Sequence, residues 1–163
     1  MSITTQGIDA RSYLSGWMQG LMGMYTKDMN AIPDEQWTKT FGGCTRPANE
    51  ITADAFGLLV FCTRCMQGDV PQSYGDEMQA MATVMADKAA AGEQIKKICG
   101  DFCAALSSAS DETLNAEVMP PWQMPTPLYS LCQMAVSHVW YHDGQLNYIQ
   151  CLLGDDQVHW MHD

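Results

Sequence analysis

Basic residues are scarce in this sequence. Its 163 residues include eight Lys and Arg but 19 Asp and Glu, which gives a formal net charge of -11. A negative surface repels the phosphates of nucleic acids and the head groups of anionic lipids. We therefore expect no nucleic-acid partner and no binding to a membrane surface.

Long apolar runs are also missing. No window approaches the roughly 20 apolar residues that a membrane span needs, and residues 1–5 lack the basic region of a signal peptide. The expected location is the cytoplasm. Seven cysteines, an odd number, then predict free thiols. The Cys62-x-x-Cys65 pair has no second pair at zinc-ribbon spacing, so we interpret it as buried structural thiols.

Sustained two-residue alternation is absent, which predicts essentially no sheet. Apolar residues recur instead at three- and four-residue steps in four segments, typical of amphipathic helices. The expected helices are 9–29, 45–66, 73–109 and 126–153. Three prolines within 119–125 predict an irregular connection across the bundle mouth, before the last helix. The sequence thus predicts an all-α four-helix bundle in a single domain, residues 1–163.

Local signals refine these helices. Asp9 and Thr45 are expected N-caps, with Pro47 in the first turn of the second helix. Three glycines inside the first helix predict close approach by another helix, because each costs up to about 1 kcal/mol relative to alanine; they are Gly16, Gly20 and Gly23. The third helix is expected to bend near Gly92 or Gly100.

Histidine is absent from the first 137 residues. His138 and His142 lie one turn apart in the middle of the apolar stripe of the last helix, where two imidazoles can turn toward one ion. They are either such a metal or catalytic pair, or buried histidines that only hydrogen-bond within the core. His159 and His162 follow in a tail that we expect to be solvated.

A metal needs a third ligand, and the second helix offers Asp54. It shares an apolar stripe with Ile51, Leu58, Phe61 and Cys65, so we expect it to face inward. A buried, unpaired carboxylate requires a cation, a protonated histidine or a shifted pKa. Asp54 therefore either completes a metal site with His138 and His142 or hydrogen-bonds one of them, and Glu50 is the reserve ligand. Zinc, nickel, iron(II) and manganese all suit this donor set.

The segment from His138 to Gly154 resembles the last helix of the DinB/YfiT-like superfamily. It contains H-x-x-x-H, then Gly144-Gln145, and ends in Leu153-Gly154. The order of four helices and the Pro-rich lead into the last helix extend the resemblance to nearly the whole chain. It implies a four-helix bundle, commonly dimeric, with a three-histidine site for a divalent metal in many members. Some members are metal-dependent thiol S-transferases that act with low-molecular-weight thiols.

Under this resemblance His138 and His142 match the two late metal ligands, and Asp54 stands where the second-helix histidine would be. One hypothesis is therefore a metal-dependent thiol transferase or hydrolase with a small-molecule substrate. The alternative is a metal-free protein with a degenerate site that binds a small ligand at the bundle mouth near Trp122, or that acts only as an interacting dimer. Trp140, Val136 and Asn147 point away from the histidines, which suggests a contact with another segment or subunit, and we expect a homodimer.

Overall fold

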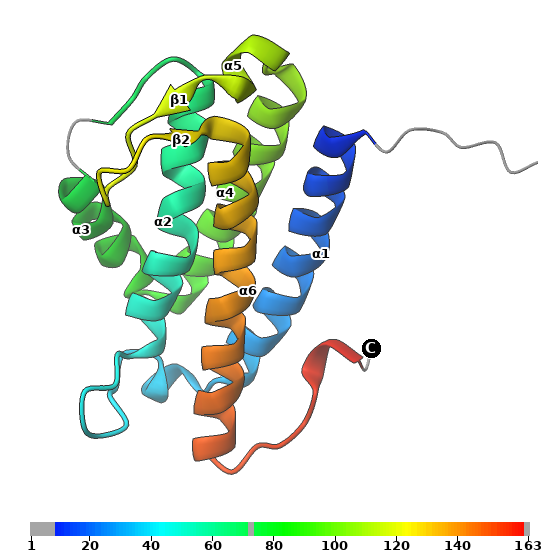
Figure 1. Ribbon diagram of the computed structural model, residues 1–163. Coiled ribbons are helices and arrows are strands. Elements are labelled where there is room, and N and C mark those ends of the chain that lie inside the picture. The colour runs from blue at the N-terminus through cyan, green and yellow to red at the C-terminus, as the bar shows by residue number, and fades with distance from the viewer. Residues whose placement is uncertain (1–8, 72–73, 162–163) are drawn as a thin grey trace, which may run out of the picture.

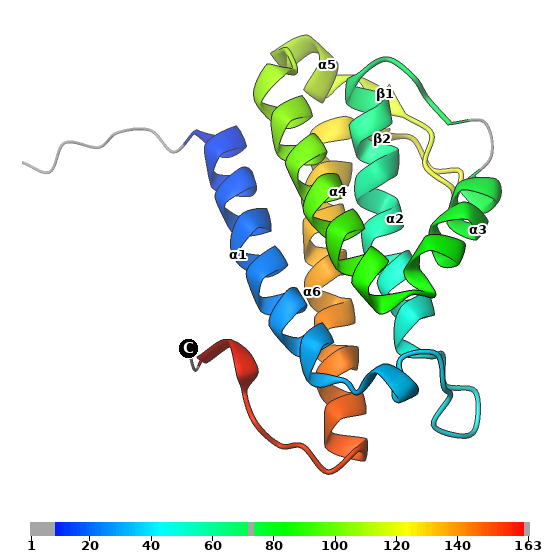
Figure 2. The same cartoon turned by 180° about the vertical axis from the view of Figure 1, so that it is seen from behind.

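The computed structural model describes residues 9–71 and 74–161. Within these residues the elements are α1 (Ala10–Ala31), η1 (Asp34–Gln36), α2 (Ala48–Met66), α3 (Tyr74–Met85), α4 (Lys88–Ser108), α5 (Asp111–Asn115), β1 (Glu117–Val118), β2 (Thr126–Pro127), α6 (Leu128–Leu152) and η2 (His159–Met161). The all-α prediction is confirmed. The four long helices stand side by side, with α6 and α4 each packed against both α1 and α2 (Figures 1 and 2). Among the described residues, every helix is too short or too polar to span a bilayer.

Helix α1 begins where the sequence predicts. The carboxylate of Asp9 accepts hydrogen bonds from the backbone N–H groups of Arg11 and Ser12, which satisfies donors that a helix start leaves free. The buried apolar side chains of α1 follow the predicted spacing and form one face toward the core. They include Leu14, Met18, Leu21 and Tyr25.

The expected close approach at the α1 glycines is wrong. A Cβ added at Gly16, Gly20 or Gly23 would meet nothing within 4 Å, because all three lie on the solvent side of the helix. Close approach occurs instead at Gly57 of α2, where an added Cβ would collide with the side chain of Met78 in α3.

The Gly20→Ala variant should therefore raise the free energy of unfolding by about 0.5–1 kcal/mol, because alanine restricts the unfolded chain and costs no contact here. Urea unfolding of the two proteins measures this difference. Gly57→Ala is the contrasting control, since its methyl group must displace Met78. Equal or lower stability of Gly20→Ala would contradict the assignment of Gly20 to an open surface.

The third predicted helix is two helices. The chain breaks at Asp87, whose carboxylate accepts from the backbone N–H of Ala90 at 2.8 Å and caps α4. The indole N–H of Trp37 donates to the carbonyl of Met85 at 2.8 Å, so a carbonyl at the end of α3 is satisfied from outside the helix. The break lies before Gly92 and Gly100, where a bend was expected, and both glycines lie within the continuous helix α4. Ser73, the expected start, lies outside the described residues.

The cap predicted at Thr45 is also wrong. Helix α2 begins at Ala48 with Pro47 in the cap position. The hydroxyl of Thr45 instead donates to the carbonyl of Gly42 at 2.8 Å and accepts from the N–H of Phe41 at 3.0 Å. These bonds close the loop 41–46 that precedes α2, and this loop forms one wall of the pocket described below.

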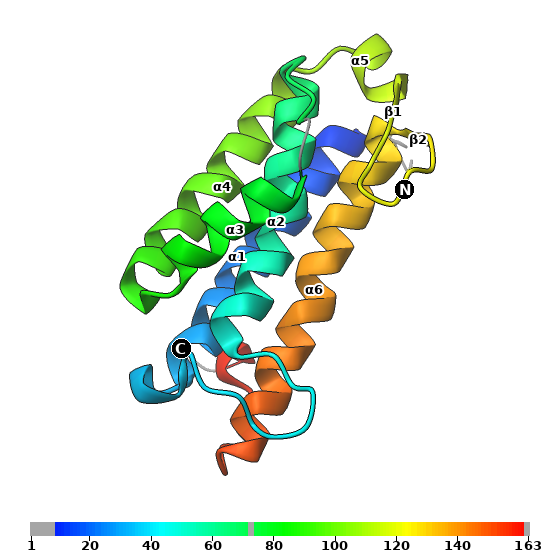
Figure 3. The same cartoon turned by 90° about the vertical axis from the view of Figure 1, so that its left-hand side faces the viewer.

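The Pro-rich connection before α6 is irregular, as expected, apart from a two-residue antiparallel pairing of β1 with β2. It lies at the end of the bundle where α6 begins, whereas the loop 41–46 lies near the other end (Figure 3).

Helix α6 is buried more widely than its single predicted stripe, because it packs against both α1 and α2. Val136, expected outside, is fully buried, and Asn147 donates to Asp28 of α1 at 2.7 Å. Trp140 is 53% exposed and meets Trp17 of α1 edge-on at 5.8 Å, so the homodimer stays a prediction. Met134 and Leu152 of the same helix are about half exposed.

Candidate metal centre

His138 and His142 face each other on α6. Their Nε2 atoms lie 3.0 Å apart, and their rings stand at 83° to one another. His142 is 1% exposed, whereas His138 is partly buried. Burial lowers the pKa of His138, and the charge of His142 lowers it further, so the ring of His138 is neutral at neutral pH.

Asp54 of α2 joins the two histidines. Its Oδ2 lies 3.4 Å from His142 Nε2, and its side chain is 30% exposed. One ligand atom from each of Asp54, His138 and His142 lies within 4.8 Å of the others. His142 and Arg46 hold the pKa of the Asp54 carboxyl well below its usual range, so the group is ionised. The structure thus brings together the three residues singled out in the sequence, and their role as metal ligands stays a prediction.

The donor set fits a divalent cation. Atoms that each lie about 2.1 Å from one ion are about 3.0 to 3.4 Å apart at octahedral or tetrahedral angles. Two separations here fall at these values, 3.0 Å between the Nε2 atoms of the two histidines and 3.4 Å between His142 Nε2 and Asp54 Oδ2. When a metal ion replaces the proton on His142 Nε2 while Nδ1 keeps its own, an Nε2 lone pair faces the lone pairs of Asp54. Among the described residues His138 Nδ1 is buried without a hydrogen-bond partner. A cation between the three groups would convert facing lone pairs into ligands.

Gln145 and Tyr141 orient His142. The Nδ1–H of His142 donates to Gln145 Oε1 at 2.7 Å, which leaves Nε2 facing Asp54 and His138. Gln145 Nε2 in turn donates to the Tyr141 hydroxyl at 3.4 Å. The Tyr141 ring lies nearly parallel to that of His138, with centroids 6.4 Å apart.

Arg46 is the residue of this site that the sequence reasoning missed. Its Nη1 donates to Asp54 Oδ2 at 2.7 Å, so one carboxylate oxygen faces both an arginine and a histidine. Arg46 lies in an irregular loop, where no helical periodicity shows the direction of a side chain. Two features of the sequence could have drawn attention to Arg46. It is one of only eight basic residues, and it directly precedes Pro47 at the start of α2.

Three other candidates stand apart from this cluster. Glu50, the reserve ligand, is exposed on α2 and is not part of the group. The described tail is largely exposed, as expected, although it contacts α1, and His159 is partly buried and bonds Asp155 at 2.7 Å. His162 lies outside the described residues.

All seven cysteines are free, as predicted. Cys62 and Cys65 are buried, and burial raises the pKa of Cys65 to about 11 and that of Cys62 well above its usual value. Both therefore remain protonated thiols, which agrees with a structural role.

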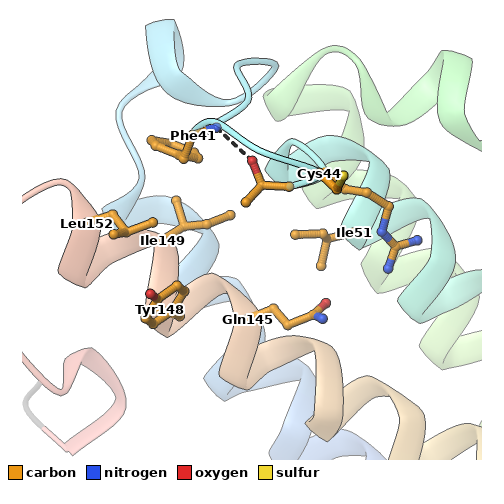
Figure 4. A pocket seen from close by; sticks show the side chains of 9 residues that line it. Phe41, Cys44, Ile51, Gln145, Tyr148, Ile149 and Leu152 are labelled. Carbon is orange, nitrogen blue, oxygen red and sulfur yellow. Dashed lines mark hydrogen bonds between the residues drawn. The ribbon is translucent and has the colours of Figure 1, made fainter.

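A pocket opens beside the cluster, between the loop 41–46 and the second half of α6 (Figure 4). Its volume is about 200 Å³. The lining residues are Phe41, Cys44, Thr45, Arg46, Ile51, Gln145, Tyr148, Ile149 and Leu152. Trp122 is not among them, so this pocket differs from the ligand site that the sequence predicts near Trp122.

A second polar cluster lies in the interface of α1 with α6. Asp28 and Asp143 are both almost fully buried, and in the described chain one oxygen of each lacks a hydrogen-bond partner. Burial and the neighbouring Asp28 raise the pKa of Asp143 to about 7. Gln150 donates to the carbonyl of Asp28 at 2.7 Å. Below neutral pH, protonation of Asp143 is thus favoured, because it relieves the repulsion between two buried carboxylates.

Comparisons with known proteins match the fold but not the sequence. No protein-family model and no curated protein matches the chain. The crystal structure of the mycothiol-dependent maleylpyruvate isomerase matches with a TM-score of 0.62 at 12% identity. A histidine-to-alanine mutant of that enzyme matches with a TM-score of 0.64 at 14% identity. Each match covers 83% of this chain and 60% of the other, so this chain spans less than two thirds of that enzyme. This chain therefore shares the helical fold of that enzyme over the matched region, which agrees with the helical architecture expected from the DinB/YfiT-like resemblance.

Proposed function

We propose that this chain is a metal-dependent enzyme in which Asp54, His138 and His142 hold a divalent zinc, nickel, iron or manganese ion. The observation that carries the proposal is the convergence of their three ligand atoms within 4.8 Å. The reaction class is thiol transfer or hydrolysis on a small molecule. The mycothiol dependence in the name of the structural neighbours supports a thiol substrate.

The surrounding residues suit this chemistry. Three protein ligands leave positions open for a substrate, and a divalent ion there would lower the pKa of a thiol or water bound to it. Gln145 fixes the tautomer of His142 through the 2.7 Å bond to Nδ1, so that Nε2 faces the site. The partial exposure of Asp54 gives a small molecule access from the side of α2.

Metal analysis of the untagged chain tests the proposal. After supplementation with each of the four metals and removal of excess, we expect about one ion per chain in the wild type. His142→Ala should lose this ion, since it removes the most buried ligand. Inductively coupled plasma mass spectrometry measures the content.

His159→Ala is the matched control, because His159 bonds Asp155 outside the cluster. This variant should retain the metal. A wild type that holds no stoichiometric metal with any of the four, or an unchanged content in His142→Ala, would refute the proposal.

One observation favours a second candidate, a metal-free binding protein. The ion pair of Arg46 with Asp54, at 2.7 Å, already neutralises the carboxylate without a metal. In that case divalent ions would leave the melting temperature unchanged, whereas small organic ligands would raise it. A rise with divalent ions that His142→Ala abolishes would exclude this candidate.

A further inference from the structure

The pocket beside the metal centre combines apolar walls with one cation. Phe41, Ile51 and Ile149 supply apolar surface from the loop 41–46, α2 and α6 (Figure 4). Arg46 is the basic residue among the residues that line it, and none of these is acidic. Because the chain as a whole has a net charge of -11, a positive group inside an apolar pocket makes this place favourable for an anionic ligand.

The guanidinium of Arg46 has capacity for a second partner. Arginine carries five N–H donors in a planar fork, and the bond to Asp54 Oδ2 uses one of them. Its side chain is 43% exposed, so an anion can reach it from the pocket. A carboxylate pairs with such a fork through two parallel hydrogen bonds.

The volume limits the ligand. Pockets for drug-sized ligands measure about 300–1,000 Å³, and this one measures about 200 Å³. Gln145 also lines the pocket and bonds His142, so a ligand seated there is adjacent to the metal centre.

We propose that this pocket binds a small organic anion with an apolar body, whose carboxylate or similar group pairs with Arg46. This inference rests on the proposed function, because it names the substrate class of the same site. It also predicts coupling. Arg46 occupies the Asp54 oxygen that faces His142, so its positive charge opposes a metal ion bound there. An anion that draws Arg46 away from Asp54 therefore favours metal binding.

Isothermal titration calorimetry of metal-free residues 1–163 with phenylacetate tests the pocket. Phenylacetamide, which has the same size but no charge, is the ligand control. We expect phenylacetate to bind at least about tenfold more tightly than the amide. Arg46→Gln should abolish this preference and Arg46→Lys should keep part of it, whereas Arg64→Gln should not change it, because Arg64 pairs with Asp69 away from this pocket.

Nickel titration with and without phenylacetate tests the coupling. In the wild type, phenylacetate should tighten nickel binding roughly fivefold, and Arg46→Gln should bind nickel more tightly even without the anion. Equal binding of acid and amide, or an acid preference that survives in Arg46→Gln, would overturn the pocket assignment. Nickel affinity unaffected by both the anion and Arg46→Gln would overturn the coupling. Failure of every protein to bind metal would refute the proposed function instead, and the metal-free titration would still decide about the pocket.

Discussion

The Asp143→Asn variant is expected to match the wild type in stability near pH 4.5 and to exceed it by a few kcal/mol near pH 8. The direction of this pH dependence follows from the pKa of Asp143, which is raised from 3.8 for an ordinary aspartate to about 7 in the folded chain. Protons bind the folded pair more tightly than the unfolded chain, so this contribution is complete below about pH 4 and is lost as the pH rises through 7. Asparagine mimics the protonated carboxyl at every pH.

Urea unfolding of both proteins between pH 4.5 and 8 measures the difference. Asp156→Asn, a change at an exposed carboxylate, is the control and should follow the wild type. Parallel curves for wild type and Asp143→Asn would show that the pair shares no proton. The titration of Asp54 does not affect this comparison. Its pKa is lowered from 3.8, so the stability that its ionised form contributes to the chain is lost only below the pH range measured.

Replacement of Trp37 by alanine is expected to lower the free energy of unfolding by about 3–5 kcal/mol. Trp37 is 1% exposed and connects three parts of the chain. Its indole donates to Met85 at the end of α3, and its carbonyl accepts from the N–H of Asn49 in the first turn of α2. The variant leaves a large cavity and an unsatisfied Met85 carbonyl.

Chemical denaturation measures this loss. Trp37→Phe keeps most of the volume and should cost about 1–3 kcal/mol, chiefly for the lost hydrogen bond. Trp122→Ala, at a 43% exposed tryptophan, should change stability by less than about 0.5 kcal/mol. A cost for Trp37→Ala close to that of Trp122→Ala would contradict the assigned role.

Periodicity predicted the helices and the inward faces that meet at the site. His138, His142 and Asp54 lie on regular helices, where a three- or four-residue step determines the direction of a side chain. The same reasoning failed at Val136, because periodicity shows one apolar stripe and not how many neighbours a helix has. Helix α6 lies between α1 and α2, so a second face is buried.

The residues that sequence reasoning missed act through tertiary contacts. The break at Asp87 depends on a cap and on Trp37, 50 positions earlier in the chain. Arg46 reaches Asp54 from a loop, and Asp28 meets Asp143 across 115 positions. Neither helix propensity nor the local pattern of apolar residues reveals such pairings, because each pairing depends on how the helices pack together.

The distribution of thiols makes the mouth of the pocket chemically distinct from the rest of the chain. Cys44 lines the pocket and, with Cys151, is one of two exposed cysteines, whereas the other five are buried or partly buried. Burial also raises the pKa of Cys65 and Cys99, which suppresses their reactive thiolates. A fluorescent or spin label attached through sulfur is therefore expected at Cys44 of the loop 41–46 and at Cys151 of α6, and not at the buried cysteines of the core.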